Sequence, residues 1–313
     1  MKAFSTDRLS LPLPAGHRFP AEKYVRLREV IESSPEFAEV ELCFPEAASE
    51  AQLRLVHTPE YVAAVLSGTL TERQVRRIGL PWSPELVERS RRSVGGTLAA
   101  CQAALIEGRA IHLGGGTHHA FPDHGAGYCV FNDVAVAVRH LRQQGLAARS
   151  LILDLDVHQG DGTAAIFAGD PSVYTCSLHG EGNFPFHKQI GDLDLAFPSG
   201  TQDALYLETL GRLLPEVLDA SRPDLVVYLA GADPFEGDTL GRLSLTKDGL
   251  RQRDRWVLEG CRSRRLPVAI ALGGGYARDI EDTVDIHLNT LRQALAPWDG
   301  TPEPADSHLP GGD

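Results

Sequence analysis

The segment Leu151–Gly162, with the sequence LILDLDVHQGDG, joins an apolar run to residue types that bind metals. The apolar run is typical of a buried parallel strand, which we expect over residues 150–157. Alternate residues of an extended chain share one face, so Asp154, Asp156 and His158 are predicted to point the same way. Two carboxylates and an imidazole form a ligand set suited to a divalent metal. Taken alone, the segment also fits a capping aspartate and a hydrogen-bonded histidine without a metal.

Three further groups of polar residues each follow a segment that we predict to be a strand, at 110–113, 225–230 and 267–272. These groups contain the adjacent His118 and His119, then Asp233, then Tyr276 after a run of three glycines. Because ligands bind beyond the carboxyl ends of parallel strands, we expect all four groups at one rim. Metal ligands, a candidate base and a phenol together indicate a metal-dependent hydrolase.

Each group has a plainer interpretation on its own. The histidine pair fits an ordinary loop, Asp233 before Pro234 fits a turn, and Tyr276 fits a packed aromatic residue. The glycine runs at 114–116 and 273–275 fit tight turns. They lack the Lys-Ser/Thr ending of a P-loop and the GxGxxG spacing, so nucleotide binding is not favoured.

Helical patterns alternate with the predicted strands along the chain. We expect helices at 17–33, 59–66, 83–107, 132–144, 164–167, 204–218, 247–261 and 279–295, and further strands at 38–44 and 173–178. This alternation predicts a single α/β domain, a three-layer α/β/α architecture with a central, mostly parallel sheet. We expect the catalytic domain to span residues 1–296. Residues 297–313, rich in proline, glycine and acids, are predicted to be a disordered tail.

The composition limits the partners. A net charge of -12 argues against nucleic acid, although an acidic surface would tolerate basic peptide or polyamine substrates. The N-terminus lacks the apolar core of a signal peptide, and no run is long enough to span a membrane, so no membrane association is expected. The five cysteines form no CxxC pair, which favours a reducing compartment. We therefore expect a cytoplasmic protein, whose oligomeric state the sequence leaves open.

Five blocks of the sequence resemble the signature segments of the zinc-dependent histone deacetylase superfamily, which has the arginase-deacetylase fold. These blocks are GGGTHHA, GAGYCVFND, DLDVHQGDG, AGADPFEGDTLGRLSLTKDGL and LGGGY, in that order. The resemblance covers residues 17–295. The EGDTLGRLS segment, with Arg253-Asp254, most resembles the class IV branch and its bacterial relatives.

The resemblance implies a role for each residue of the blocks. One Zn²⁺, with Fe²⁺ as an alternative, would be bound by Asp156, His158 and Asp233. His119 would be the general base and His118 its electrostatic partner, and Asp161 and Asp154 respectively would orient them. Tyr276 would donate its hydroxyl to the substrate carbonyl. A structural K⁺ would be bound by Asp154, Asp156, His158, Ser177 and Leu178. The substrate would contact Gly127, Tyr128, Phe184, Phe186 and Gly274.

The implied activity is removal of an acyl group, acetyl or longer, from the lysine side chain of a protein or peptide. A small acylated amine such as an acetylpolyamine is the alternative substrate, and a catalytically silent acyl-binding module is a second alternative. An arginase-like enzyme with two manganese ions is disfavoured, because Gly160 and Phe235 stand where it needs acids. Two departures from the family pattern are Lys23, where class I members have an arginine, and the absence of a substrate-anchoring aspartate in 78–86.

Overall fold

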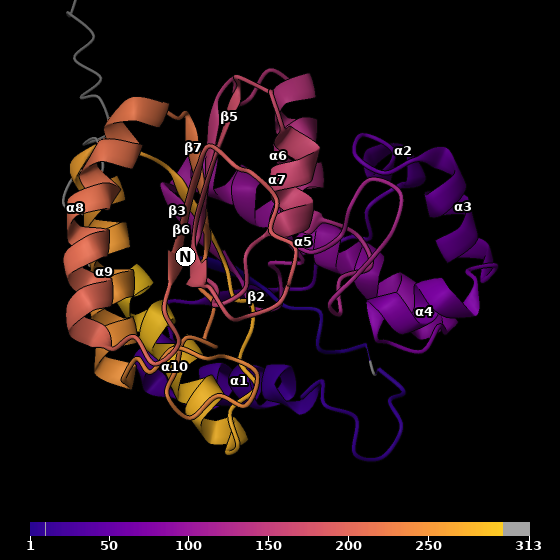
Figure 1. The fold of residues 1–313 in the computed structure, drawn as a ribbon, viewed down its shortest axis with the longest axis horizontal. Coiled ribbons are helices and arrows are strands. Elements are labelled where there is room, and N and C mark those ends of the chain that lie inside the picture. The colour runs from indigo at the N-terminus through magenta and orange to yellow at the C-terminus, as the bar shows by residue number, and fades with distance from the viewer. Residues whose placement is uncertain (10, 297–313) are drawn as a thin grey trace, which may run out of the picture.

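The computed structural model describes residues 1–9 and 11–296 and has one eight-stranded sheet at its centre (Figure 1). All seven strand pairings are parallel, and the order is β2-β1-β3-β8-β7-β4-β5-β6. The strands are β1 (Lys2–Phe4), β2 (Glu41–Cys43), β3 (Arg109–His112), β4 (Ser150–Asp154), β5 (Val173–Gly180), β6 (Leu193–Phe197), β7 (Leu225–Leu229) and β8 (Val268–Ala271). The predicted α/β class with a parallel central sheet is confirmed. The predicted tail at 297–313 lies outside the described residues, and the domain boundary stays a prediction.

Helices cover both faces of the sheet, as Figure 1 shows. One face is covered by α1 (Glu22–Ser33), α8 (Asp203–Ser221), α9 (Lys247–Ser263) and α10 (Ile280–Leu295). The other face is covered by α5 (Pro84–Glu107), α6 (Asp133–Gln143) and α7 (Asp161–Phe167). The short helices α2 (Glu50–Leu53), α3 (Pro59–Ser67) and α4 (Glu72–Ile78) form a lobe with its own apolar core, and η1 (Pro35–Phe37) follows α1. None of the described helices is long and apolar enough to cross a membrane.

Burial on both faces explains the unbroken apolar run of β4. Leu151 and Leu153 pack on the face covered by α8 and α9, while Ile152 packs against α5 and α6. The glycine pair in α5 has a packing reason as well. A Cβ at Gly96 would lie 2.6 Å from His112 Nε2, and one at Gly95 would lie 1.8 Å from the Glu46 carbonyl oxygen. Close approach of α5 to β3 therefore requires Gly96, and its close approach to the segment after β2 requires Gly95.

Most predicted elements are present, and the differences lie at their ends and at the sheet edges. The first helix begins at Glu22 rather than at residue 17, and α7 begins at Asp161 rather than at 164. The central strand ends at Asp154 rather than at 157. The short strands β1 and β6 and the short helices α2 and α4 were not predicted. Three of these four elements have only three to five residues, too few for a clear periodic pattern.

Candidate metal centre and active-site pocket

Asp156 and His158 lie in a tight bend directly after β4, where Asp233 reaches them from the loop after β7. One ligand atom from each residue lies within 4.8 Å of the other two, and all three residues are buried. The bend is held by its own acids: the Asp156 amide donates to Asp154 Oδ1 at 3.1 Å, and the His158 amide donates to Asp156 Oδ1 at 2.9 Å. The prediction that an extended strand aligns these side chains is therefore wrong. The three ligands meet because the chain turns and because the β7 loop lies alongside.

These three residues fit a bound divalent cation. Asp233 Oδ2 is buried and accepts no hydrogen bond from the described residues, although it lies 3.2 Å from His158 Nδ1. Burial lowers the pKa of His158, but the carboxylates of Asp156 and Asp233 outweigh it and raise this pKa to about 10. The site thus attracts positive charge, and its two carboxylates and imidazole are suitable zinc ligands. Three protein ligands leave a coordination position for a substrate, as in catalytic zinc sites.

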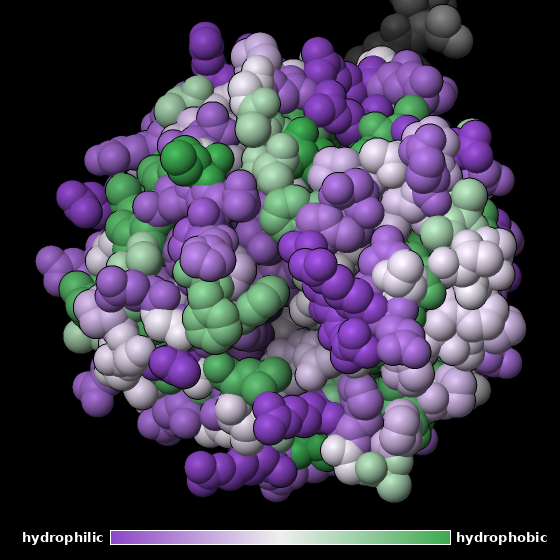
Figure 2. Space-filling view, turned by 45° about the vertical axis from the view of Figure 1, so that its right-hand side comes forward, coloured by the Kyte–Doolittle hydropathy of each residue, from purple (hydrophilic) through white to green (hydrophobic). Residues whose placement is uncertain are grey.

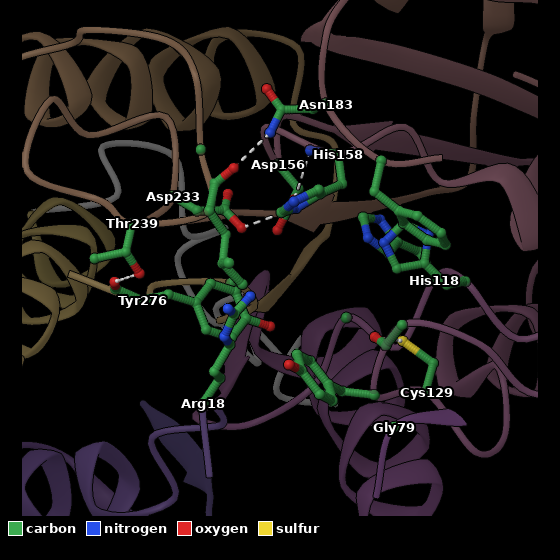
Figure 3. Close-up of a pocket in the computed structure, with 18 of the residues that line it drawn as sticks. Arg18, Gly79, His118, Cys129, Asp156, His158, Asn183, Asp233, Thr239 and Tyr276 are labelled. Atoms are coloured by element: carbon green, nitrogen blue, oxygen red, sulfur yellow. Dashed lines mark hydrogen bonds and ion pairs between the residues drawn. The ribbon is translucent and has the colours of Figure 1, made fainter. Parts of the chain in front are cut away.

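Two histidine–aspartate pairs lie beside this centre (Figure 3). His118 Nδ1 is 2.6 Å from Asp154 Oδ2, and His119 Nδ1 is 2.7 Å from Asp161 Oδ1. The two imidazole centroids are 4.1 Å apart, and all four side chains are nearly inaccessible to solvent. The structure thus places each histidine beside the aspartate that was expected to orient it.

The two histidines have opposite electrostatic environments. Burial lowers the pKa of His118, but Asp154 and then Asp156 outweigh it and raise this pKa to about 9. Burial and the neighbouring His118 lower the pKa of His119 well below its ordinary value. At neutral pH the His119 ring is therefore uncharged. Its Nδ1 must carry the proton because an ionised Asp161 only accepts, and this leaves Nε2 free to accept a proton.

The loop that carries the two histidines is fastened to the N-terminus of α6. Asp133 accepts hydrogen bonds from the amides of Gly116 at 2.9 Å and Thr117 at 2.8 Å. Asn132, the N-cap of α6, donates from Nδ2 to the Ala120 carbonyl at 3.2 Å. The sequence indicated Asn132 and Asp133 only as residues at a helix start. Their fastening of the histidine loop was missed, because a cap and a tertiary contact use the same residue types.

Tyr276 enters the pocket from the glycine loop after β8. Gly274 has a φ of +60°, and a Cβ there would lie 2.3 Å from Asp233 Oδ2, so the close approach requires glycine. The Tyr276 amide donates to Asp238 Oδ2 at 2.6 Å, and Asp238 Oδ1 accepts from the Leu240 and Gly241 amides. Asp238 thus fixes the tyrosine loop, a contact the sequence analysis did not assign. Burial and then Asp233 raise the pKa of Tyr276 well above its ordinary value, so its phenol is neutral.

These groups line a pocket of about 580 Å³ that opens to the surface. Its walls include Gly127, Tyr128, Phe184, Phe186 and Gly274, the five residues expected to contact a substrate. Figure 3 shows the metal-binding residues between His118 on one side and Tyr276 on the other. Figure 2 shows a molecular face hollowed near its centre, with strongly hydrophilic side chains along one border and hydrophobic ones along another. Arg18, Arg77 and Arg242, which the sequence analysis missed, also line the pocket.

The wall segment at Gly127 and Tyr128 has an unusual backbone. Tyr128 has a φ of 66°, in the left-handed region. Gly127 lies so close to His119 that a Cβ there would be 2.6 Å from the ring. The Phe184 ring packs edge-on against His119, with centroids 4.8 Å apart at 81°. Phe186 is 80% exposed and lies at the outer lip. Tyr128 and Phe184 thus give the pocket aromatic walls next to the metal centre.

The residues expected around K⁺ lie behind the metal centre. Asp154 is paired in register with Ser177 across β4 and β5, and Leu178 follows on β5; all three are buried. Ser177 Oγ lies 2.9 Å from His179 Nδ1. The arrangement places oxygen atoms near Asp154, and the potassium site stays a prediction.

Lys23 and a small second cavity both lie next to Tyr276. The Lys23 ammonium donates to the carbonyl oxygens of Gly274 and Gly275 and lies 5.2 Å from the Tyr276 ring centroid. The cavity, of about 80 Å³, shares Tyr276, Tyr128 and Gly274 with the main pocket. Lys23 therefore holds the tyrosine loop.

A buried arginine supports the metal centre from α9. Arg253 Nη1 donates to the carbonyls of Leu155 at 3.1 Å and Gly231 at 2.7 Å, which follow β4 and β7. Its Nε donates to Asp254 Oδ1 at 2.8 Å, and Asp254 also accepts from the Tyr228 hydroxyl. Arg253 thus ties together the two strand ends that supply Asp156 and Asp233. The sequence analysis named Arg253 and Asp254 only as part of a family resemblance. It did not indicate that Arg253 contacts the carbonyl groups of Leu155 and Gly231.

Comparison with known proteins gives matches over most of the chain. Residues 17–291 match the family described as histone deacetylase domain. The chain is 31% identical to histone deacetylase 2 of Arabidopsis thaliana over 292 residues, covering 89% of this chain and 75% of that protein. It is 32% identical to the acetoin utilization protein AcuC of Bacillus subtilis over 253 residues, covering 74% and 65% respectively. It is also 49% identical to an uncharacterized protein of Picosynechococcus sp. over 283 residues, covering 90% and 94%. The matched range contains the metal centre, both histidine–aspartate pairs and Tyr276.

Proposed function

This chain belongs to the histone deacetylase domain family, and from that premise we propose that it is a zinc-dependent amidohydrolase that removes an acyl group from the lysine side chain of proteins or peptides. The observation that carries the proposal is the meeting of three kinds of group at one pocket floor. These are a buried Asp-His-Asp centre, two histidine–aspartate pairs and a neutral tyrosine.

Three side chains of the pocket would each have a separate role in amide hydrolysis. Neutral His119, oriented through Nδ1 by Asp161, would accept a proton from the attacking water at Nε2 and return it to the leaving amine. His118, kept positively charged by Asp154, would stabilise the negative charge that develops during attack. Tyr276 would donate its hydroxyl to the oxygen of the scissile carbonyl.

Asp156, His158 and Asp233 would hold the Zn²⁺, or Fe²⁺ in its place. A metal ion bound there supplies Lewis acidity, which polarises the amide carbonyl and lowers the pKa of water. We further propose a structural K⁺ that would be bound by Asp154, Asp156, His158, Ser177 and Leu178, a proposal supported by the register that pairs Asp154 with Ser177. The EGDTLGRLS segment and Arg253-Asp254 support a place near the class IV branch. Five free cysteines support a reducing, cytoplasmic setting.

The pocket favours an acyl-lysine of modest length. The lysine stem would pass between Tyr128 and Phe184, whose faces suit a chain of methylene groups. The adjoining cavity of about 80 Å³ would receive the acyl group, and at roughly 10–15 Å³ per water it has room for about five to eight waters. That space supports acetyl as the preferred acyl group over a chain such as myristoyl.

Turnover of a peptide panel bearing acetyl-, octanoyl- and myristoyl-lysine tests the proposal. We expect release of acetate from the acetyl peptide, loss of turnover after chelation, and recovery when Zn²⁺ is restored. Tyr276→Phe should retain the metal and lose turnover, and Tyr174→Phe, which alters a half-buried tyrosine outside the pocket, serves as the matched control. Absence of turnover on all peptides with zinc bound would overturn the proposal and favour a silent acyl-binding module.

A further inference from the structure

Three arginines from separate parts of the chain line the same pocket as the metal centre. Arg18 precedes α1, Arg77 lies in the last turn of α4, and Arg242 lies in the loop after β7. All three are exposed, while the metal ligands are buried, so the guanidinium groups belong to the outer part of the pocket. The mouth of the pocket therefore carries positive charge from three directions.

No carboxylate of the described chain forms an ion pair with these groups, although the charge of Arg77 favours the ionised form of the Asp161 carboxylate. Among the residues that the structure describes, only two acids line the pocket, Asp156 and Asp233, and both belong to the metal centre. Within residues 1–9 and 11–296, no ion pair involves the three arginines, whereas Arg76, next to Arg77, is paired with Glu72. The chain as a whole has a net charge of -12, so unpaired arginines at the mouth are opposite in sign to the overall charge.

The segment after β5, which contacts Arg242 through Asn183, holds a further cation. Lys188 lies on the segment that carries Phe184 and Phe186, and its ammonium donates to the carbonyls of Asn183 and Pro185 at 2.7 Å each. Carbonyl partners fix the ammonium without cancelling its charge. The Asp161 and Glu181 carboxylates oppose the charge of Lys188. The exposed charged side chains that line the mouth itself are the three arginines, and their field attracts anions and repels cations.

The acylated lysine side chain is itself neutral, so the mouth must act on the part of the substrate that stays outside. We propose that the arginines select acyl-lysine in an anionic setting, with carboxylates close to the acylated residue. This inference rests on the proposed deacylase function and names its substrate class. The carboxylates have two sources, acidic side chains flanking the lysine and the free α-carboxylate of a C-terminal acyl-lysine. A cationic acetylpolyamine is disfavoured by the same charges.

Matched acetyl-lysine peptides with aspartate, serine or lysine at the two positions on each side test the inference, each prepared with an amide and with a free carboxyl terminus. An exposed ion pair changes an equilibrium constant by roughly two- to fivefold, so three arginines should separate the acidic from the basic peptide by about tenfold or more in kcat/KM. The difference should shrink between low and high NaCl because exposed charges are screened. Acetylspermidine should be a poor substrate.

Charge-reversal variants assign the effect to the mouth. Arg18→Glu, Arg77→Glu and Arg242→Glu should each lower the acidic-to-basic ratio several-fold, and the triple variant should invert the order. Arg212→Glu, an exposed position on α8 outside the pocket, is the matched control and should leave the ratio unchanged. Unfolding midpoints close to wild type would exclude misfolding as the cause.

Each outcome bears on a different statement. A preference that depends only on the free α-carboxylate supports the inference and identifies that source. Equal turnover of acidic and basic peptides, a preference for basic ones, or efficient turnover of acetylspermidine overturns the inference and leaves the deacylase function intact. Absence of turnover on every substrate overturns the proposed function, and this inference with it.

Discussion

Replacing Asp161 with asparagine probes how His119 is prepared to accept a proton. The substitution keeps the size of the side chain and removes the charge that lies 2.7 Å from His119 Nδ1. A hydrogen bond to a charged partner contributes about 1.5–3 kcal/mol, which corresponds to roughly a ten- to 150-fold change in rate. Loss of a carboxylate that orients a catalytic histidine has similar consequences in other enzymes. We therefore expect Asp161→Asn to lower kcat by about ten- to 100-fold.

The pH dependence gives the same prediction a second readout. Burial raises the pKa of Asp161 to about 6, so its carboxylate is charged above that pH and protonated below it. Wild-type kcat on an acetyl-lysine peptide should therefore fall below about pH 6, and Asp161→Asn should lack this limb. Asp170→Asn, which removes a carboxylate paired with Arg139 away from the pocket, is the control. Turnover of Asp161→Asn within twofold of wild type at pH 8, with equal metal content, would refute the role given to this pair.

Three further predictions address other parts of the structure. Tyr276→Phe should lower kcat by about 10²–10³-fold, as for other oxyanion donors, while zinc content measured on the same sample stays unchanged. Arg253→Met leaves Asp254 buried without its partner, so chemical unfolding should show a loss of about 3–5 kcal/mol; a loss below 1 kcal/mol would contradict this. Burial lowers the pKa of His57 to about 4, and the Nε2 atom of its neutral ring accepts a hydrogen bond from the backbone amide of Asn132. In the unfolded state this histidine binds a proton below about pH 6.5, whereas in the folded state it stays neutral down to about pH 4. The free energy of unfolding should therefore fall by about 3 kcal/mol between pH 6.5 and pH 4. His57→Gln should show a smaller loss in pH-dependent unfolding.

Much of the fold could be predicted because both faces of the sheet are buried. Leu151, Ile152 and Leu153 are all inaccessible, so β4 appears in the sequence as an unbroken apolar run. In the edge strand β6, four of the five residues are partly or fully exposed, so its sequence gives a weaker signal. The short β1 is recognisable only through its pairing with β2 and β3.

The metal centre could be predicted in its residues but not in its geometry. Parallel strands bring the ends of β4 and β7 to one edge, which is why Asp156 and Asp233 were correctly expected to meet. The expected alternation along a strand failed, since the chain bends after Asp154. Residue pattern alone does not indicate where a strand gives way to a bend that its own carboxylates stabilise.

The supporting and rim residues depend on contacts that sequence cannot supply. Arg253 acts on a carbonyl 98 residues away, and nothing in the local sequence of α9 indicates that contact. Arg18, Arg77 and Arg242 come from three distant segments and meet only in the folded chain. The net charge indicated tolerance of basic substrates, whereas the exposed arginines at the pocket mouth carry the opposite sign. Averages over a whole chain thus conceal the field at a single site.

The most direct test of the central claim is metal content and turnover measured on one batch of protein, for wild type and Asp233→Asn. We expect one zinc, or one ferrous ion, per wild-type chain and hydrolysis of an acetyl-lysine peptide. The variant, which lacks a buried carboxylate ligand, should lose both together. Two metal ions per chain, or wild-type turnover that persists after the metal is removed, would contradict it.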